Sequence, residues 1–308
     1  MNPRVAVIVR TKDRPEFLAR ALADVAAQTY QDAEIVVVND RGAAAPVADT
    51  VAASSVAGRV RVAETAAPGG RCAAANLGLR STEAEFVILH DDDDRWAPTF
   101  LARTVEYLDA HPADAGVMTA TEIVYERRDG ARWVEYGREP FWRGMTAVTF
   151  SSLLEVNRAV PISFLYRRSL HDELGYYDES LETVEDWEFY LRVTAVHSVG
   201  FLAGEPLAFW TQRPDTVGAE ANSMFELAGA HERDDAAVRD AALRAWVAKN
   251  GAGVPLYLAA MERRLREEFA RELEAQLARQ REEIVTAIYD RHPLWRRLRR
   301  LRRGHAGR

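Results

Sequence analysis

An apolar segment of strand length, Phe86–Leu89, runs through His90 into four consecutive aspartates, Asp91–Asp94. Because adjacent carboxylates repel one another, such a run is costly unless solvent or a cation relieves it. One interpretation is a solvated acidic turn before a helix that begins near Pro98, since proline suits a first helical turn. The other is a metal–phosphate site, because open α/β sheets bind ligands at the carboxyl ends of their strands. The strand context favours the metal–phosphate site.

Apolar strands alternate with helical segments through the first half of the chain. The segments at 4–9 and 34–38 are dominated by β-branched residues, as in a buried parallel sheet. This alternation predicts an α/β fold with a right-handed, mostly parallel sheet. The expected strands are 4–9, 34–38, 59–63 and 86–89, and the expected helices are 15–28, 46–55 and 72–80.

Polar clusters follow three of these strands, around Thr11, Asp40 and Asp91–Asp94. The carboxyl ends of parallel strands meet at one edge of a sheet, so we expect these clusters to converge. The segment 69–71, Gly-Gly-Arg, suggests a phosphate loop but lacks the Walker spacing, and an ordinary turn explains it equally well. No G-x-G-x-x-G pattern follows the first strand, so a dinucleotide-binding fold has no direct support.

The second half of the chain is less regular. Its first part is rich in aromatic residues, which either belong to the core or form a platform for sugar rings; the core is the favoured interpretation. The expected elements are strands at 115–125, 132–136 and 161–166, with a hairpin turn at Asp129–Gly130, and a short helix at 168–174. The aromatic residues are Trp133, Tyr136, Phe141 and Trp142.

A further helix is predicted near residues 183–192, with Thr183 as its N-cap. It begins with two acids, Glu185 and Asp186, and acids suit the positive end of a helix. Alternatively, a carboxylate at this position faces the metal site and acts as a general base. Spacing alone does not separate these two interpretations.

Composition excludes several classes of protein. The chain of 308 residues has one cysteine, Cys72, so it forms neither an internal disulfide nor a cysteine-based zinc cluster. We expect a reducing, cytoplasmic location, because no signal-peptide pattern begins the chain and no apolar run approaches a membrane span. The net charge of −7 is asymmetric: residues 291–308 carry eight arginines and no acid, which leaves −15 for the remainder.

Six segments share the order of one known family's motifs. They are Val9–Pro15, an apolar strand and a turn ending in Asp-Arg-Pro; Val37–Gly42, close to a strand ending in Asp-Asp-Gly; Gly70–Gly78, close to Gly-basic…Asn-x-Gly; Asp91–Trp96, close to Asp-x-Asp-Asp-x-Trp; Glu185–Arg192, close to a Glu-Asp…Arg helix; and Glu205–Trp210, close to a late strand that closes the site. Over roughly residues 4–215 the chain therefore resembles glycosyltransferase family 2, with the nucleotide-sugar-binding fold called GT-A. Each motif is weak alone, but their order is specific.

The resemblance implies how a nucleotide-sugar donor is held. Asp40 would accept a hydrogen bond from the base of a pyrimidine nucleotide, with Thr11 and Arg71 nearby. Asp91 and Asp92 would hold the ribose or metal-bound water. The implied nucleotide-sugar-binding residues are Thr11, Asp13, Asp40, Arg71, Asn76, Asp91, Asp92 and Arg213.

The resemblance also implies a metal and a base. Asp93 would be the main ligand of Mn²⁺ or Mg²⁺, with Asp91 as a second ligand, and the metal would offset charge on the departing diphosphate. Asp186 would deprotonate the acceptor hydroxyl, which attacks the anomeric carbon with inversion.

The chain departs from the family pattern at two places. Many relatives carry Ala-Arg-Asn before the metal strand, where this chain has Ala-Ala-Asn at 74–76, so the basic contact is expected from Arg71. Many carry a histidine late in the closing strand, where this chain has Gln212 and Arg213. Arg213 is a poor metal ligand but suits the diphosphate as a fixed cation.

The last third of the chain lies outside the resemblance. Helices are predicted at 224–247 and 255–290, and the second carries a narrow apolar stripe that packs on the rest of the chain or pairs with a second copy; packing within the chain is favoured. Residues 294–303 form a basic amphipathic segment suited to an anionic membrane surface, or a solvated tail. Nucleic acid is disfavoured because the remainder of the protein is acidic. The stripe is Met261, Leu265, Phe269, Leu273 and Leu277.

The sequence therefore predicts a GT-A domain at 1–220, with a mixed, mostly parallel sheet flanked by helices, a helical extension at 221–290 and a basic tail at 291–308. The predicted function is metal-dependent, inverting transfer of a sugar from a UDP- or dTDP-linked donor to a glycan or lipid-linked acceptor in surface polysaccharide synthesis. We expect a cytoplasmic enzyme, peripheral on the inner face of the plasma membrane.

Two alternatives belong to other classes. One is a metal-dependent phosphohydrolase built on His90 and Asp91, although the seven histidines show no metal-ligand spacing. The other is a non-catalytic carbohydrate-binding or scaffold protein, which the intact acids at Asp93 and Asp186 argue against.

Overall fold

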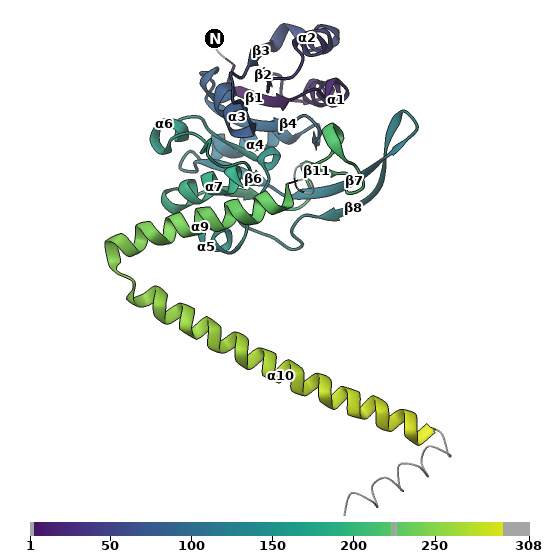
Figure 1. Cartoon of the computed structure of the whole chain (residues 1–308). Helices are drawn as coiled ribbons and strands as arrows, with labels where there is room; N and C mark the ends of the chain where they lie inside the picture. Colours follow the sequence, from purple (N-terminus) through teal and green to yellow (C-terminus); the bar gives the residue numbers. More distant parts are fainter. Residues whose placement is uncertain (1–2, 223, 225–226, 292–308) are drawn as a thin grey trace, which may run out of the picture. The chain divides into compact units, whose positions relative to one another are not determined.

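The computed structural model describes residues 3–222, 224 and 227–291. The chain divides into two units, residues 1–238 and 239–308. The described strands all belong to the first unit, where they form two sheets (Figure 1). The described part of the second unit is helical.

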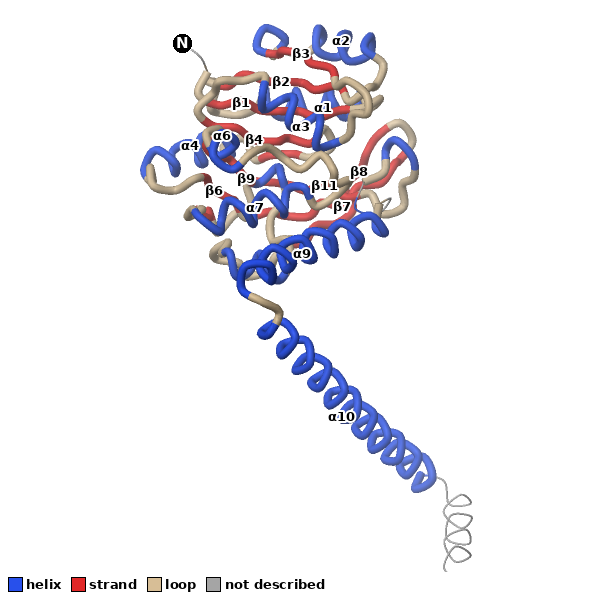
Figure 2. Tube along the Cα trace, turned by 60° about the vertical axis from the view of Figure 1, so that its left-hand side comes forward, coloured by secondary structure: helices blue, strands red, loops and turns tan. Residues whose placement is uncertain are grey.

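The larger sheet has seven strands in the order β10-β6-β9-β4-β1-β2-β3. Its strands lie one above another in Figure 2, from β3 down to β6. Strand β9 runs antiparallel to both of its neighbours, and the other pairings are parallel. The predicted mostly parallel sheet is therefore confirmed. The strands are β1 (Val5–Thr11), β2 (Ala33–Asn39), β3 (Val60–Glu64), β4 (Phe86–Asp91), β6 (Gly116–Thr119), β9 (Phe164–Arg167) and β10 (Gly200–Leu202).

Helices cover both faces of this sheet. Side chains alternate along a strand, so Val7 of β1 packs with one helical layer and Ile8 with the other. Helices α1, α2 and α4 contribute to the first layer, and α3, α5, α6 and α7 to the second. The helices are α1 (Pro15–Ala26), α2 (Ala44–Ala53), α3 (Arg71–Arg80), α4 (Phe100–Ala110), α5 (Phe150–Glu155), α6 (Leu170–Leu174) and α7 (Glu185–Val196).

The smaller sheet has the order β5-β11-β7-β8. Its β7–β8 hairpin turns at Gly130, which has φ of +60°, so the predicted hairpin is confirmed. The continuous strand predicted at 115–125 is wrong, because the chain leaves the larger sheet at Ala120 and enters the smaller one as β7. Its strands are β5 (Arg95–Trp96), β7 (Thr121–Asp129), β8 (Arg132–Pro140) and β11 (Ala208–Gln212).

Two other local predictions were also wrong. The strand predicted at 161–166 is confirmed only from Phe164, where β9 begins, because Pro161–Ser163 forms a 3₁₀ turn. Thr183 does not cap α7, because Val184 occupies the capping position with φ of +55°. The Thr183 hydroxyl instead donates to Asp234, 3.1 Å away. The cap was predicted from local sequence, whereas this partner lies far along the chain.

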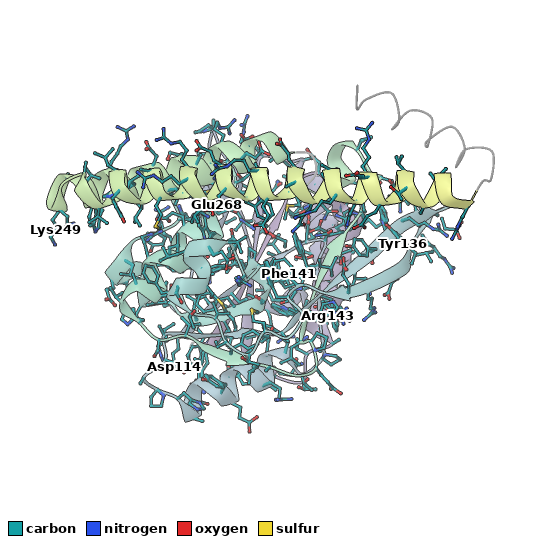
Figure 3. All side chains as sticks on the ribbon, turned by 90° about the horizontal axis from the view of Figure 1, so that it is seen from below. Asp114, Tyr136, Phe141, Arg143, Lys249 and Glu268 are labelled. Atoms are coloured by element: carbon teal, nitrogen blue, oxygen red, sulfur yellow. The ribbon has the colours of Figure 1, made fainter. Side chains whose placement is uncertain are left out.

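Two long helices follow the sheets. Helix α9 (Ala228–Asn250) and helix α10 (Gly253–Arg291) are separated by a break at 251–252, as predicted. Oxygen- and nitrogen-tipped side chains occur along α10, Glu268 among them (Figure 3). Of the helices in the described ranges, none is both long and apolar enough to cross a membrane. The basic segment 294–303 lies outside the described residues.

The contact between α3 and β1 generates a stability prediction. A Cβ added at Gly78 would lie 2.3 Å from Cγ2 of the buried, β-branched Ile8 and 3.2 Å from Cγ2 of Val38. Alanine usually stabilises a helix by up to about 1 kcal/mol relative to glycine. Here the clash should dominate, and Gly78→Ala should destabilise the protein by about 1–3 kcal/mol in urea unfolding.

Gly229→Ala is the matched control, because a Cβ at this position of α9 meets nothing within 4 Å. This substitution should leave the stability unchanged or raise it slightly. Equal behaviour of the two variants would contradict the close packing of α3 on β1.

Candidate active site

A cavity of about 1060 Å³ lies where β1, β2 and β4 end. Thr11, Asp40 and Asp91, one from each of these strand ends, line it. The Thr11 hydroxyl donates to Oδ2 of Asp92 at 2.7 Å, which joins the end of β1 to the acidic turn. The predicted convergence of the three polar clusters is therefore confirmed.

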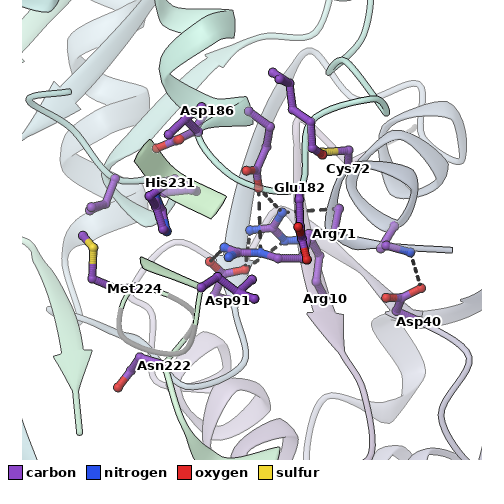
Figure 4. A pocket seen from close by; sticks show the side chains of 18 of the residues that line it. Arg10, Asp40, Arg71, Cys72, Asp91, Glu182, Asp186, Asn222, Met224 and His231 are labelled. Carbon is purple, nitrogen blue, oxygen red and sulfur yellow. Dashed lines mark hydrogen bonds and ion pairs between the residues drawn. The ribbon is translucent and has the colours of Figure 1, made fainter. Parts of the chain in front are cut away.

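The cavity collects most of the predicted site residues. Asp40 and Asp186 lie on opposite sides of it, with Arg10, Arg71 and Asp91 between them (Figure 4). The predicted residues that line it are Thr11, Asp13, Asp40, Arg71, Asp91, Asp93 and Asp186. The remaining three, Asn76, Asp92 and Arg213, are buried and do not line it.

Asn76 holds another part of the chain in place. Its side-chain amide donates to the carbonyl of Tyr177 at 2.9 Å and to Glu179 at 2.8 Å. Its carbonyl oxygen accepts from the Tyr177 N–H at 3.0 Å. The motif residue therefore fastens the segment after α6 to α3, and the nucleotide contact expected from it is not available in this arrangement.

Asp92 and Asp94 are buried within the acidic turn. Asp92 accepts hydrogen bonds from Thr11 and from the Arg14 guanidinium, and burial raises its pKa to about 7 although Arg14 opposes the shift. Asp94 accepts the Thr211 backbone N–H at 2.8 Å. Burial, and then the neighbouring Asp93, raise the pKa of Asp94 well above its usual value. The expected ribose contact of Asp92 is not available because its carboxylate faces these protein groups.

Asp93 pairs with a buried arginine that does not line the cavity. Its Oδ2 accepts hydrogen bonds from Arg213 and from the Asn222 amide at 3.2 Å. The Arg213 side chain is 0% exposed, and its guanidinium lies 4.5 Å from the Phe17 ring centroid and 5.4 Å from that of Trp133. Arg213 thus pairs with the carboxylate and does not reach the cavity, so the diphosphate contact expected from it is absent in this arrangement.

Arg10 is a site residue that the sequence analysis missed. Its guanidinium lies 2.6 Å from Asp91 Oδ1 and 3.1 Å from Glu185 Oε1, so it links β4 to the start of α7. Arg71 adds longer contacts of 3.9 Å to Asp91 and 3.8 Å to Glu185. Burial alone would raise the pKa of both acids, but the two arginines outweigh it and lower both. A charged residue inside an otherwise apolar strand was the available signal.

Asp186 is a cavity-lining carboxylate in the first turn of α7. It is 9% exposed, and its Oδ2 accepts a hydrogen bond from the Asn157 amide at 2.9 Å. Burial, and then the neighbouring Glu185, raise its pKa to about 6, while the Asn157 bond opposes that shift. Asn157 was also missed, because it lies in a loop far from α7 in sequence.

Asp40 organises the loop before α3. Its Oδ1 accepts the Gly70 N–H at 2.9 Å and the Thr65 hydroxyl at 2.8 Å. Gly69 has φ of +74°, and a Cβ there would lie 2.6 Å from the same oxygen, so glycine is required. Asp13 makes a similar contact, accepting the Ala43 N–H at 2.8 Å.

The four aromatic residues of the second half have divided roles. Phe141 and Trp142 line the cavity. Trp133 packs against Phe17 with ring centroids 5.5 Å apart, and Tyr136 is 48% exposed. None of the four is fully buried, and the platform for sugar rings stays a prediction for Phe141 and Trp142.

The strand ends and the acidic turn of this site lie within a region that matches a known protein family. Residues 6–175 match the family model described as Glycosyl transferase family 2. The chain belongs to this family. Among curated relatives, an uncharacterized glycosyltransferase, YwdF of Bacillus subtilis, is 29% identical over 202 residues, which cover 64% of this chain and 70% of YwdF. The succinoglycan biosynthesis protein ExoW of Rhizobium meliloti is 35% identical over 117 residues, covering 37% of this chain and 36% of ExoW.

Solved structures share the fold of this glycosyltransferase. S. aureus TarS in complex with UDP-GlcNAc superposes with a TM-score of 0.54 at 19% identity, covering 72% of this chain and 63% of that chain. The mannosyltransferase PcManGT of Pyrobaculum calidifontis, in complex with GDP-Man and Mn²⁺, gives 0.50 at 18% identity, covering 86% and 81%. The matched part of this protein thus spans less than two thirds of the TarS chain. The predicted GT-A fold is confirmed.

The contact between Asn157 and Asp186 generates a prediction that requires no substrate. Asn157→Ala removes a hydrogen bond that favours the ionised carboxylate, so the pKa of Asp186 should rise above about 6. An NMR titration that follows the carboxyl carbon of Asp186 measures this pKa. Asn250→Ala, on the exposed end of α9, is the control and should leave the titration of Asp186 unchanged. An unchanged or lowered pKa in Asn157→Ala would contradict the assigned contact.

Proposed function

We propose that this enzyme transfers a sugar, with inversion, from a nucleoside-diphosphate donor to a hydroxyl of a glycan or lipid-linked glycan. One observation carries the proposal: a buried carboxylate with a raised pKa, Asp186, lies across a single cavity from the polar ends of β1, β2 and β4. This geometry supports a donor among the strand ends and an acceptor beside Asp186. The roles given below to Asp40, Arg71, Asp91 and Asp93 belong to the same proposal.

The donor assignment draws on chemistry and on the structural neighbours. TarS has been solved with UDP-GlcNAc and PcManGT with GDP-Man, so nucleotide sugars suit this fold. We favour a UDP- or dTDP-sugar, with Asp40 accepting from the base and Arg71 near the diphosphate. A fixed guanidinium lining the cavity suits a phosphate group.

In the proposed transfer Asp186 acts as the base and Asn157 orients it. Asp186 takes the proton of the acceptor hydroxyl, whose oxygen forms the new bond to the anomeric carbon. The bond from that carbon to the diphosphate oxygen breaks, and its electron pair leaves with the nucleoside diphosphate. The Asn157 bond keeps the carboxylate oriented and partly offsets the rise in its pKa. Attack opposite the leaving group inverts the configuration.

The residues present fit a divalent cation only if the donor helps to bind it. Among the described residues, no group of three or more His, Cys, Asp or Glu side chains is placed to bind a metal. Mg²⁺ is usually held by one or two carboxylates together with substrate phosphates, and Asp93 and Asp91 line the cavity as such a pair. When bound, Mn²⁺ or Mg²⁺ would offset the charge on the departing diphosphate.

Neither alternative function finds support. His90 is buried, 3.1 Å from Asp24 through Nε2 and edge-on to Trp96, so it does not assemble a phosphohydrolase metal site with Asp91. Membership of a glycosyltransferase family argues against a scaffold protein. Surface polysaccharide synthesis is the proposed pathway, in keeping with the relative ExoW, a succinoglycan biosynthesis protein.

Cytoplasmic location and membrane association are also proposals. The basic segment 294–303 would bring the enzyme to an anionic membrane surface, where a lipid-linked acceptor is found. For the helix at 255–290 we propose packing against the rest of the same chain. Pairing with a second copy of the protein is the alternative. Flotation of the full chain with anionic vesicles tests the first proposal: binding that is lost at high salt supports it, and no binding at low salt rejects it.

The donor site is tested by thermal shift with UDP-, dTDP- and GDP-sugars, each with and without Mn²⁺. A ligand that binds only the native state raises the melting temperature, and we expect the largest rise with a pyrimidine nucleotide sugar and Mn²⁺ together. Asp93→Asn should lose the Mn²⁺-dependent part of the rise. Because this variant leaves Arg213 without its carboxylate, each variant is compared with its own ligand-free baseline. A full Mn²⁺-dependent shift in Asp93→Asn would contradict the metal assignment.

The base is tested by Asp186→Asn. Turnover should fall by roughly 10²–10⁴-fold, the usual effect of a positioned base, while donor affinity changes little. In the unmodified enzyme, turnover should decline as the pH falls below about 6, because the protonated carboxyl cannot accept the acceptor proton. Normal turnover in the variant at saturating donor would remove Asp186 from the mechanism.

A further inference from the structure

Asp234, on α9, binds the loop that leads into α7. Its Oδ2 accepts hydrogen bonds from the Glu182 N–H at 3.0 Å, the Thr183 N–H at 2.9 Å and the Thr183 hydroxyl at 3.1 Å. Asp234 is 5% exposed and Thr183 is fully buried, so water has little access to these bonds. Hydrogen bonds to a charged acceptor are stronger than neutral ones. One oxygen thus holds two consecutive residues of the loop.

The next residue adopts a backbone conformation that needs such support. Val184 has φ of +55°, in the left-handed region that β-branched side chains rarely occupy. Residues in this region persist only when the surrounding structure holds them there. Of the side chains that the structure describes, none caps the first turn of α7 directly. The bonds from Asp234 therefore stabilise the chain just before Val184.

The two residues after Val184 carry the carboxylates of the site. Glu185 pairs with Arg10 at 3.1 Å, and Asp186 accepts from Asn157 at 2.9 Å. A small rotation of the chain at Val184 would displace both carboxylates from these partners. Leu227 and His231, near Asp234 in sequence, also line the cavity. The matched family region ends at residue 175, so this segment lies beyond it.

We propose that Asp234 is a positioning residue, which holds the loop at 182–184 so that Asp186 faces the acceptor hydroxyl. This inference rests on the proposed function, because it assigns Asp234 a role through the proposed base. The salt bridge from Arg233 to Glu182 at 2.9 Å joins the same two segments, but it is exposed and contributes little. The buried carboxylate of Asp234 is the group that holds the loop.

The test compares Asp234→Ala, Asp234→Asn and Asp240→Ala in the full-length enzyme. Asp240→Ala removes the same charge from an exposed position of the same helix and is the matched control. Displacement of a reacting group by about 1 Å can reduce a rate by about 100-fold, so Asp234→Ala should lower kcat by roughly 10- to 100-fold. UDP affinity by thermal shift should stay within about twofold, since the strand-end residues are untouched.

Rescue by the conservative variant separates positioning from general stability. Asp234→Asn keeps an acceptor oxygen in the same place and should recover most of kcat, whereas Asp240→Ala should match the unmodified enzyme. If Asp234→Ala does not fold, Thr183→Val removes only the hydroxyl bond and should lower kcat several-fold with unchanged UDP affinity. Unchanged kcat in the folded variants, or a parallel loss of UDP affinity and kcat, would overturn the proposal.

Asp186→Asn, measured in the same series, distinguishes the two levels of inference. If Asp186→Asn keeps normal turnover, the proposed base is wrong, and the role of Asp234 fails with it. If Asp186→Asn loses turnover while Asp234→Ala retains it, only the positioning role is overturned. Loss in both, with recovery in Asp234→Asn, supports both.

Discussion

The site depends on the pairing of buried or half-buried carboxylates with arginines that are themselves buried or half-buried. Asp91, Asp92 and Asp93 are adjacent in sequence, and each pairs with a different arginine, Arg10, Arg14 or Arg213. These arginines come from β1, from the turn before α1 and from the chain after β11. Removing one partner of a buried pair leaves an uncompensated charge, which is strongly destabilising. The acidic turn therefore keeps its conformation only when three distant segments are in place.

The same turn joins the two sheets. β4 of the larger sheet ends at Asp91, and β5 of the smaller sheet begins at Arg95. Between them, Asp94 accepts the Thr211 N–H of β11 at 2.8 Å, and the buried Trp96 stacks on Phe100 at 4.6 Å. Burial of the two rings anchors the far end of the turn. The acidic turn is therefore held by groups from both sheets, by Thr11 of β1 through Asp92 and by Thr211 of β11 through Asp94, which suits a site that must stay preorganised.

Much of the site lies beyond the matched family region. Residues 6–175 contain the strand ends and the acidic turn, but Asp186, Arg213 and Asn222 all follow residue 175. The segment that includes Asp234 is later still, and it binds the loop before Asp186 through three hydrogen bonds. In the proposed function the donor side is thus built mainly by the matched region, and the acceptor side by the part of the chain that follows it. Acceptor preference can then vary while the donor fold is retained.

The sequence alone determined the α/β fold and the convergence of the strand ends, because strand periodicity and parallel topology fix where strand ends meet. The resemblance to family 2 added the other predicted residues that line the cavity, among them Asp186, whose spacing alone equally suited an acid in the first turn of a helix. Tertiary structure decided the rest. Asn76 and Asp92 carry motif positions yet bind other parts of the chain, and Arg213 pairs with Asp93 without lining the cavity. Asn157 and Asp234 could not be found from local sequence, and for Arg10 the only local signal was its charge within an apolar strand. The roles of all three arise from partners 29 to 175 positions away, brought together by long-range packing.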